Sequence, residues 1–224
     1  MNEGPKSRMR LRFARLEGAE RMSHLEQIKA FRGIAAASGL DCWPAKAGSA
    51  VPKMAFGPAL PGGYGSRCEY ADLYLAQSCK EEVVRAKLSA VLPGSFSLLS
   101  ARRVPVHFPS IEASVGAARY LIETKLDGEI SRESLDAFLA RESAPYEKTG
   151  PAGVSGTIDA RPLVLSAELD AATGSLALTL RVLPGKNIKP EAALGVIAGK
   201  EVEIKRIIRE ELYWLDSKGG LEVI

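Results

Sequence analysis

Aromatic residues, cysteine and histidine are all scarce in this 224-residue chain, which is 6% aromatic and contains three cysteines and two histidines. No apolar run approaches the roughly 20 residues that a membrane-spanning helix needs, and the basic N-terminal segment lacks the apolar core of a secretory signal. The few scattered cysteines argue against a disulfide framework and favour a reducing compartment. Since 46% of the residues are hydrophobic and 25% are charged, we expect a globular cytoplasmic protein without membrane contact.

The motifs of self-sufficient enzymes are also absent from the sequence. Cys42, Cys68 and Cys79 are too far apart for a common iron–sulfur or zinc spacing. The chain contains no dinucleotide-binding fingerprint, no paired-carboxylate motif and no Ser-His-Asp arrangement. We therefore expect no metal and no cofactor, and we favour a non-catalytic role over an enzymatic one.

What is present is an uneven distribution of charge along the chain. Residues 1–110 contain 16 basic residues against 9 acidic ones, a net charge of +7, whereas the remainder contains 14 against 18, a net charge of −4. A basic half is typical of a surface that meets phosphate groups. The alternative is a drift of surface charge that has no function.

Hydrophobic periodicity and capping patterns predict the elements of the first half. The expected strands are residues 8–13, 53–56, 68–75 and 96–104. Ser23 with Glu26, and Ser78 with Glu81, each match a capping box, which predicts a helix after each serine. The Gly- and Pro-rich residues 44–65 predict a long loop.

The second half repeats this order of elements. Its expected strands are residues 117–125, 162–169, 175–183 and 202–212, and its expected helices begin near Ser131 and Pro190. The pattern predicts an α+β fold made of two tandem, duplicated ferredoxin-like (βαββαβ) domains, each with helices on one face of an antiparallel sheet. We place the basic first domain at residues 1–106 and the acidic second domain at residues 107–224.

Several short motifs carry a family resemblance. They are Arg12-Phe13-Ala14-Arg15, Ser23-His24-Leu25-Glu26, Glu69-Tyr70-Ala71-Asp72 and, most distinctively, Pro52-Lys53-Met54-Ala55-Phe56-Gly57-Pro58-Ala59-Leu60-Pro61. With them, residues 10–105 resemble the N-terminal part of a bacterial family of radical-SAM-linked domains of unknown function. The second half is similar in general pattern, through Ile158-Asp159-Ala160-Arg161-Pro162 and Arg209-Glu210-Glu211-Leu212-Tyr213.

The resemblance implies a partner and a metabolic context. Members of the family are fused to radical SAM enzymes or encoded beside them, often near a ribonuclease of the G/E type and ribosomal-protein genes. It therefore implies a radical SAM protein as partner and a connection with RNA. Many members carry a Gly-Phe-Asn-Pro-Arg-like stretch before the Pro-Lys pair, whereas this chain has Gly48-Ser49-Ala50-Val51. If that Asn and Arg contact a ligand in relatives, this chain has altered the contact.

His24 is the one candidate catalytic residue. It stands at the start of the first expected helix, where the positive end of the helix dipole lowers an imidazole pKa and favours the neutral form that acts as a base. The alternative is a structural residue, since the first turn of a helix tolerates polar side chains.

The glycine-rich loop is a candidate phosphate site. Its residues are Lys53, Gly57, Gly62, Gly63 and Tyr64. Glycines let backbone amides approach an anion, the lysine adds charge, and the tyrosine could stack on a base. The loop lacks the lysine that directly follows the last glycine of a P-loop. The alternative is an irregular turn that needs glycine for its backbone angles.

Arginines of two strands are the candidate nucleic-acid contacts. Arg8, Arg10 and Arg12 share one face of the first strand, and Arg102 and Arg103 lie in the fourth. An exposed sheet face with arginines is how several RNA-binding modules meet phosphate. The aromatic residues that stack bases on such faces are expected to be missing here. The alternative is solvated charge that keeps strand edges from aggregating.

Three functional hypotheses follow. The leading one is an accessory protein that binds a structured RNA, or an RNA-bound partner, and serves a radical SAM enzyme. The second is a metal-independent ribonuclease or transferase with His24 as base. The third is a pure docking module for the radical SAM protein, in which the basic charge is incidental.

Overall fold

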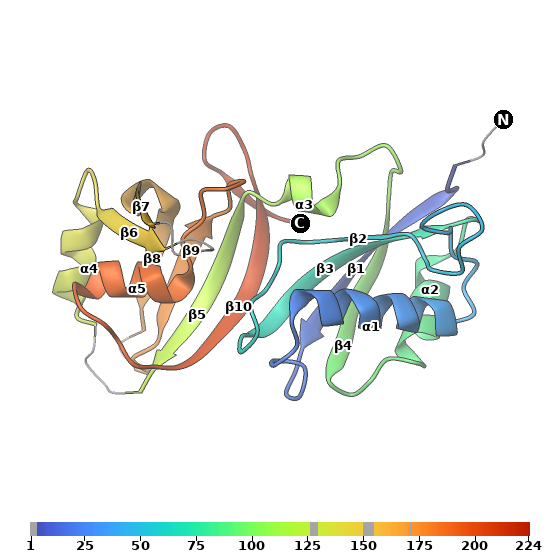
Figure 1. Ribbon diagram of the computed structural model, residues 1–224, viewed down its shortest axis with the longest axis horizontal. Coiled ribbons are helices and arrows are strands. Elements are labelled where there is room, and N and C mark those ends of the chain that lie inside the picture. The colour runs from blue at the N-terminus through green and yellow to red at the C-terminus, as the bar shows by residue number, and fades with distance from the viewer. Residues whose placement is uncertain (1–3, 126–129, 150–154, 171) are drawn as a thin grey trace. The chain divides into compact units, whose positions relative to one another are not determined.

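The computed structural model describes residues 4–125, 130–149, 155–170 and 172–224 (Figure 1). The chain divides into two compact units, Met1–Val115 with Ile224, and Gly116–Val223. Each is a mixed α/β unit whose paired strands run antiparallel. Each helix in these residues is too short or too polar to span a bilayer.

The first unit begins with the expected alternation of strands and helices. Its elements are β1 (Ser7–Arg15), α1 (His24–Ala37), β2 (Met54–Phe56), β3 (Gly65–Leu75), α2 (Glu81–Ser89), β4 (Phe96–Val104) and the short α3 (Ile111–Ser114). The sheet order is β4-β1-β3-β2. Helix α3 has no counterpart in the prediction.

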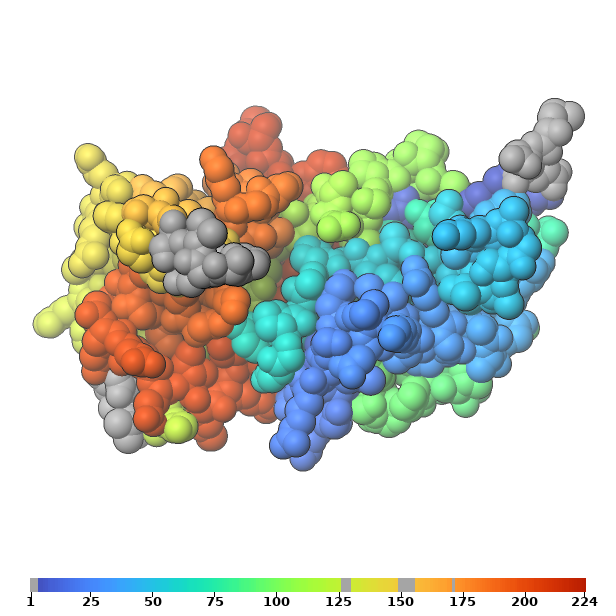
Figure 2. Space-filling view, in the orientation of Figure 1, coloured from blue at the N-terminus to red at the C-terminus, as the bar shows by residue number. Residues whose placement is uncertain are grey.

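Both long helices of the first unit lie on one face of its sheet. Met9 and Leu11 of β1 are fully buried, and they pack in one apolar cluster with Phe31 of α1 and Val84 of α2. This is the face expected for the odd-numbered residues of β1, because side chains alternate along a strand. Figure 2 shows the first unit from the side that α1 covers.

The two capping predictions have different outcomes. At α1 the box forms, since Ser23 accepts the N–H of Glu26 and the Glu26 carboxylate accepts the N–H of Ser23. At α2 the prediction is wrong, because Lys80 is the N-cap and makes no side-chain cap. The Glu81 carboxylate accepts the N–H of Arg103 in β4 at 2.6 Å instead.

The second unit contains a longer series of elements. They are β5 (Ala117–Thr124), α4 (Arg132–Leu139), β6 (Pro145–Thr149), β7 (Ser155–Asp159), the 3-10 helix η2 (Arg161–Leu163), β8 (Val164–Leu169), β9 (Leu176–Arg181), α5 (Pro190–Ala198), β10 (Ile204–Leu215) and β11 (Leu221–Val223). The sheet order is β10-β5-β9-β8, with β11 on β10, and β6 pairs with β7 in a separate two-stranded sheet.

The β6–β7 pair has no counterpart among the elements predicted from the sequence. Its strands, PYEKT and SGTID, are short and polar, so they lack the apolar alternation that announces a strand. Residue 162 was expected to begin a strand, but residues 161–163 form η2 and β8 begins at Val164.

Gly116, just before β5, lets the backbone of this segment lie close to that of β10 in the second unit. Its N–H donates to Tyr213 O at 2.8 Å, and a Cβ added there would lie 2.5 Å from Leu215 Cβ and 3.0 Å from Leu215 N. We expect Gly116→Ala to lower the free energy of unfolding by about 1–3 kcal/mol, because β10 must move away. Urea unfolding of the whole chain measures this.

Gly195→Ala in α5 is the matched control. There a Cβ would meet Lys200 O at an ordinary 3.6 Å, so we expect a gain of up to about 1 kcal/mol from helix propensity. Equal midpoints for Gly116→Ala and the unmodified chain would contradict the steric argument.

Candidate functional site

The candidate site lies on the sheet of the first unit, on the face opposite α1 and α2. Arg8, Arg10 and Arg12 alternate with the core residues of β1 and therefore point to this opposite face. We call it the arginine face. Its cross-strand neighbours in β3 are Tyr74, Asp72 and Tyr70, opposite Arg8, Arg10 and Arg12 respectively.

Asp72 holds two of these arginines. Its Oδ1 accepts Arg10 Nε at 2.9 Å, and its Oδ2 accepts Arg8 Nε at 3.0 Å and Arg10 Nη2 at 3.1 Å; Arg8 Nη2 also donates to Oδ2. Asp72 is completely buried, and Arg8 and Arg10 are 1% and 7% exposed. The three residues form a buried ion cluster with one excess positive charge.

The chain after β4 completes the hydrogen bonding of Arg8. Arg8 Nη1 donates to Phe108 O at 2.7 Å, and Nη2 donates to Pro109 O at 2.6 Å. The guanidinium is therefore satisfied by a carboxylate and two carbonyls, as a buried charge requires. Arg8 and Arg10 were expected on an exposed face, and the structure places both inside the first unit, since Asp72 and the 108–109 segment surround them.

Arg102 and Arg103 lie on opposite faces of the sheet of the first unit. Arg102 lies opposite Arg10 on the arginine face and is exposed. Arg103 lies opposite Met9, on the side of the helices, where its Nη2 donates to Cys79 O at 2.7 Å. Of the two, only Arg102 extends the arginine face.

Tyrosines on the arginine face were missed by the sequence reading. Tyr70 is buried, whereas Tyr74 is half-buried, with Arg8 Cζ 5.7 Å and Lys53 Nζ 4.8 Å from its ring centroid. The expectation that this face lacks aromatic residues was wrong. The signal was available, because the alternation of residues 68–75 puts Tyr70, Asp72 and Tyr74 on one side of a strand.

Lys53 reaches the arginine face from the chain just before β2. Its N–H donates to Trp43 O at 2.7 Å, and its carbonyl accepts the N–H of Tyr74 at 3.1 Å. These bonds fix the backbone while the half-buried side chain lies over Tyr74. Lys53 is thus the residue of the predicted phosphate loop that the structure brings to the arginines.

The glycines of that loop have structural roles. The N–H of Gly57 donates to Tyr70 O at 3.0 Å, and the N–H of Gly63 donates to Glu20 O at 2.7 Å. Gly63 has a φ of +93°, a conformation that favours glycine. Amides that already donate to carbonyls do not cradle a phosphate. Gly62 is exposed, but Tyr64 is only 8% exposed and offers no open ring for stacking.

His24 is the first residue of α1, as predicted. Its ring meets Phe56 edge to face, with the centroids 6.4 Å apart. Packing against an aromatic side chain of β2 fits the structural alternative, and the catalytic role stays a prediction.

The three cysteines are free thiols. Burial, followed by the nearby charge of Asp41, raises the pKa of Cys42 to about 11, so this thiol is protonated at neutral pH. A protonated thiol is a poor metal ligand and a poor nucleophile. No group of metal-binding side chains occurs within the described parts of the chain.

Removal of the Asp72 charge tests the buried cluster. We expect Asp72→Asn to lower the free energy of unfolding by about 3–5 kcal/mol, since two buried guanidinium groups lose their counter-ion. Urea unfolding measures the change. The control is Glu168→Gln, which removes an ion pair to Arg119 whose Glu168 side chain is 61% exposed, with an expected cost below about 1 kcal/mol. Similar costs for both variants would show that the cluster does not stabilise the first unit.

Comparison with known proteins identifies a family and also finds a likeness to a solved structure. No curated protein matches the chain. A chain of "Crystal Structure of a Cbf5-Nop10-Gar1 Complex" superimposes with a TM-score of 0.46 at 11% identity, covering 90% of this chain and 48% of that one. The family profile matches residues 8–190, which include the arginine face and most of the second unit. The chain therefore belongs to the bacterial family described as "Uncharacterized protein conserved in bacteria (DUF2344)".

Proposed function

We propose that this protein is a cytoplasmic accessory protein that binds RNA, or an RNA-associated partner, and serves a radical SAM enzyme. The RNA would contact the arginine face of the first unit. The observation that carries the proposal is the charge of that face, where Asp72 is the one carboxylate among Arg8, Arg10, Arg12 and Arg102 in the paired rows of β1, β3 and β4.

Accessibility assigns different roles to these cations. Arg8 and Arg10 are buried, so they cannot contact RNA directly. They add to the positive electrostatic potential of the arginine face and hold the strands in place. Arg102 is exposed and Lys53 is half-buried, so these two can reach phosphate oxygens. The half-buried ring of Tyr74, which both Arg8 and Lys53 approach, places an aromatic side chain near the same cations. Cations beside an aromatic side chain on a sheet are typical of single-stranded RNA contacts.

The radical SAM link rests on the motifs of the first half. The Pro52–Pro61 motif spans Lys53 and β2, so the residues that resemble the radical-SAM-linked family lie beside the arginine face. In this proposal the radical chemistry belongs to the partner and the present chain supplies binding.

We infer further that the two units are duplicated ferredoxin-like domains. The strand orders support this inference. Within each unit, β4-β1-β3-β2 and β10-β5-β9-β8 both read fourth, first, third, second when the β6–β7 pair is treated as an insertion. In both units a helix follows the first strand and another follows the third, which is the split βαβ arrangement.

Salt dependence of RNA binding tests the arginine face. We expect Arg102→Ala with Lys53→Ala to weaken binding of a fluorescent single-stranded RNA and to reduce the slope of log K against log salt by about 1.4, because two phosphate contacts are lost and each contributes about 0.7 for a single strand. Fluorescence anisotropy at several salt concentrations measures both.

The matched control is Lys80→Ala with Arg85→Ala, which removes the same charge from exposed positions at α2, on the other side of the sheet. Its slope should stay near that of the unmodified chain. Equal loss in both double variants would mean that the protein attracts RNA by net charge alone, and the arginine face would have no special role.

Recovery of the tagged protein from its native cells tests the partner. We expect co-purification of a radical SAM protein and of RNA, with the RNA lost after ribonuclease treatment and reduced for the Arg102/Lys53 variant. A radical SAM protein retained without any RNA would replace this proposal with the docking hypothesis. Absence of a radical SAM protein would refute the assigned partner.

A further inference from the structure

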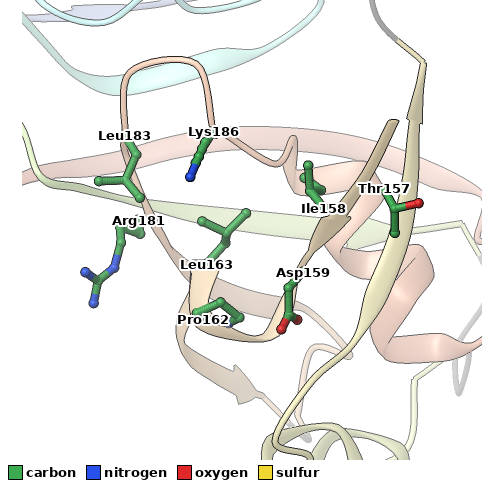
Figure 3. Close-up of a pocket in the computed structure, with 8 residues that line it drawn as sticks. All are labelled: Thr157, Ile158, Asp159, Pro162, Leu163, Arg181, Leu183 and Lys186. Atoms are coloured by element: carbon green, nitrogen blue, oxygen red, sulfur yellow. The ribbon is translucent and has the colours of Figure 1, made fainter. Parts of the chain in front are cut away.

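The second unit contains a pocket that the RNA proposal does not use. It has a volume of about 480 Å³ and lies between β7, η2 and the chain that follows β9 (Figure 3). Its apolar wall consists of Ile158, Pro162, Leu163 and Leu183. Both the size and the apolar lining are typical of sites for small organic molecules.

Two cations line the same pocket. Arg181 is the last residue of β9, and Lys186 lies in the turn that follows. Figure 3 shows the Lys186 side chain directed from this turn toward Leu163, whereas the Arg181 guanidinium extends away from Lys186. Across the described ranges, neither side chain has a carboxylate partner, and the buried Nε of Arg181 has no hydrogen-bond acceptor. A desolvated donor without an acceptor is costly, so an anionic group would be stabilised here.

The one acidic residue in the lining is already committed to the fold. Asp159 Oδ1 accepts the backbone N–H of Ala144 at 2.8 Å and that of Arg161 at 3.0 Å. These bonds, with that to Ala144 contributing most, lower the pKa of Asp159 and keep it ionised at neutral pH. Among the described residues, the pocket therefore has two cations without counter-ions and one carboxylate that is bound to backbone.

Hydrogen bonds hold the walls of the pocket in place. Arg161 Nη2 donates to Leu139 O and its Nη1 to Val164 O, both at 3.0 Å, which fixes η2. In the turn after β9, Leu183 N–H donates to Asn187 Oδ1 at 2.7 Å, and Lys148 Nζ from β6 donates to Asn187 O at 2.8 Å. A site with fixed walls loses little entropy when it binds a ligand.

We propose that this pocket binds a small amphiphilic anion, with a carboxylate or phosphate group that accepts from Lys186 or Arg181 and an apolar body against Leu163, Ile158 and Leu183. Arginine and lysine donate charge-assisted hydrogen bonds to either oxyanion. The apolar wall then distinguishes such a ligand from free phosphate. This site is independent of the arginine face, since it consists of residues of the second unit alone.

Titration calorimetry on the full chain tests the pocket with three probes of equal alkyl chain length: sodium decanoate, decyl phosphate and decanol. Inorganic phosphate is the fourth probe and has no alkyl chain. We expect decanoate or decyl phosphate to bind at least about tenfold more tightly than decanol and phosphate, because only these probes satisfy both the cations and the apolar wall. The preference between decanoate and decyl phosphate identifies the natural head group.

Variants locate the binding. Arg181→Gln with Lys186→Gln should weaken the anionic probes by about tenfold or more while decanol is unaffected; the exposed Lys186→Gln alone gives a smaller loss without risk to the fold. Lys218→Gln, in the turn between β10 and β11, is the control with the same charge change as Lys186→Gln. Decanol binding as tightly as decanoate, an unchanged double variant, or no binding of any probe would each overturn the proposal.

Discussion

The first unit depends on a single carboxylate that holds two arginines between neighbouring strands. Without Asp72, β1 would present Arg8 and Arg10 to the interior of the unit, and Arg10 would face Arg102 directly across the β1–β4 pair. Like charges opposite one another destabilise a sheet, and buried charges need partners. Asp72 reduces the repulsion between the arginines and gives the buried guanidinium groups a counter-ion. Because it pairs with two arginines, the cluster keeps a net charge of one positive unit. The same carboxylate thus stabilises the register of the strands and permits a basic surface beside them.

The candidate sites of the two units differ in how their charge is used. On the arginine face most of the charge is bound internally, so that Arg102 and Lys53 at its margins are the groups that can meet a polyanion. In the pocket of the second unit the acidic group is bound to backbone, and no carboxylate in the described part of the chain pairs with Arg181 or Lys186. Both therefore offer positive charge, the first as an open surface for a chain of phosphates and the second as a small apolar cavity for one anionic group.

The sequence predicted most strands and helices because their signals are local. The alternation in β1 and the capping box of Ser23 and Glu26 depend on neighbours a few residues apart, and both were confirmed. The box proposed for Ser78 failed because Glu81 binds the backbone of Arg103, a residue distant in the sequence. The polar strands β6 and β7 were not predicted for a related reason, because only their pairing with each other identifies them as strands.

By itself the sequence determined which residues share a strand face in the apolar strands, where the basic charge is concentrated, and the order of the long strands and helices. Those properties follow from periodicity and composition, which need no knowledge of distant contacts. Only the tertiary structure decided that Arg8 and Arg10 are buried on Asp72, that Arg102 rather than Arg103 lies opposite Arg10, and that the loop glycines donate to carbonyls. Burial and partner choice depend on strand register and on which segments meet, and these are set by packing across the whole unit.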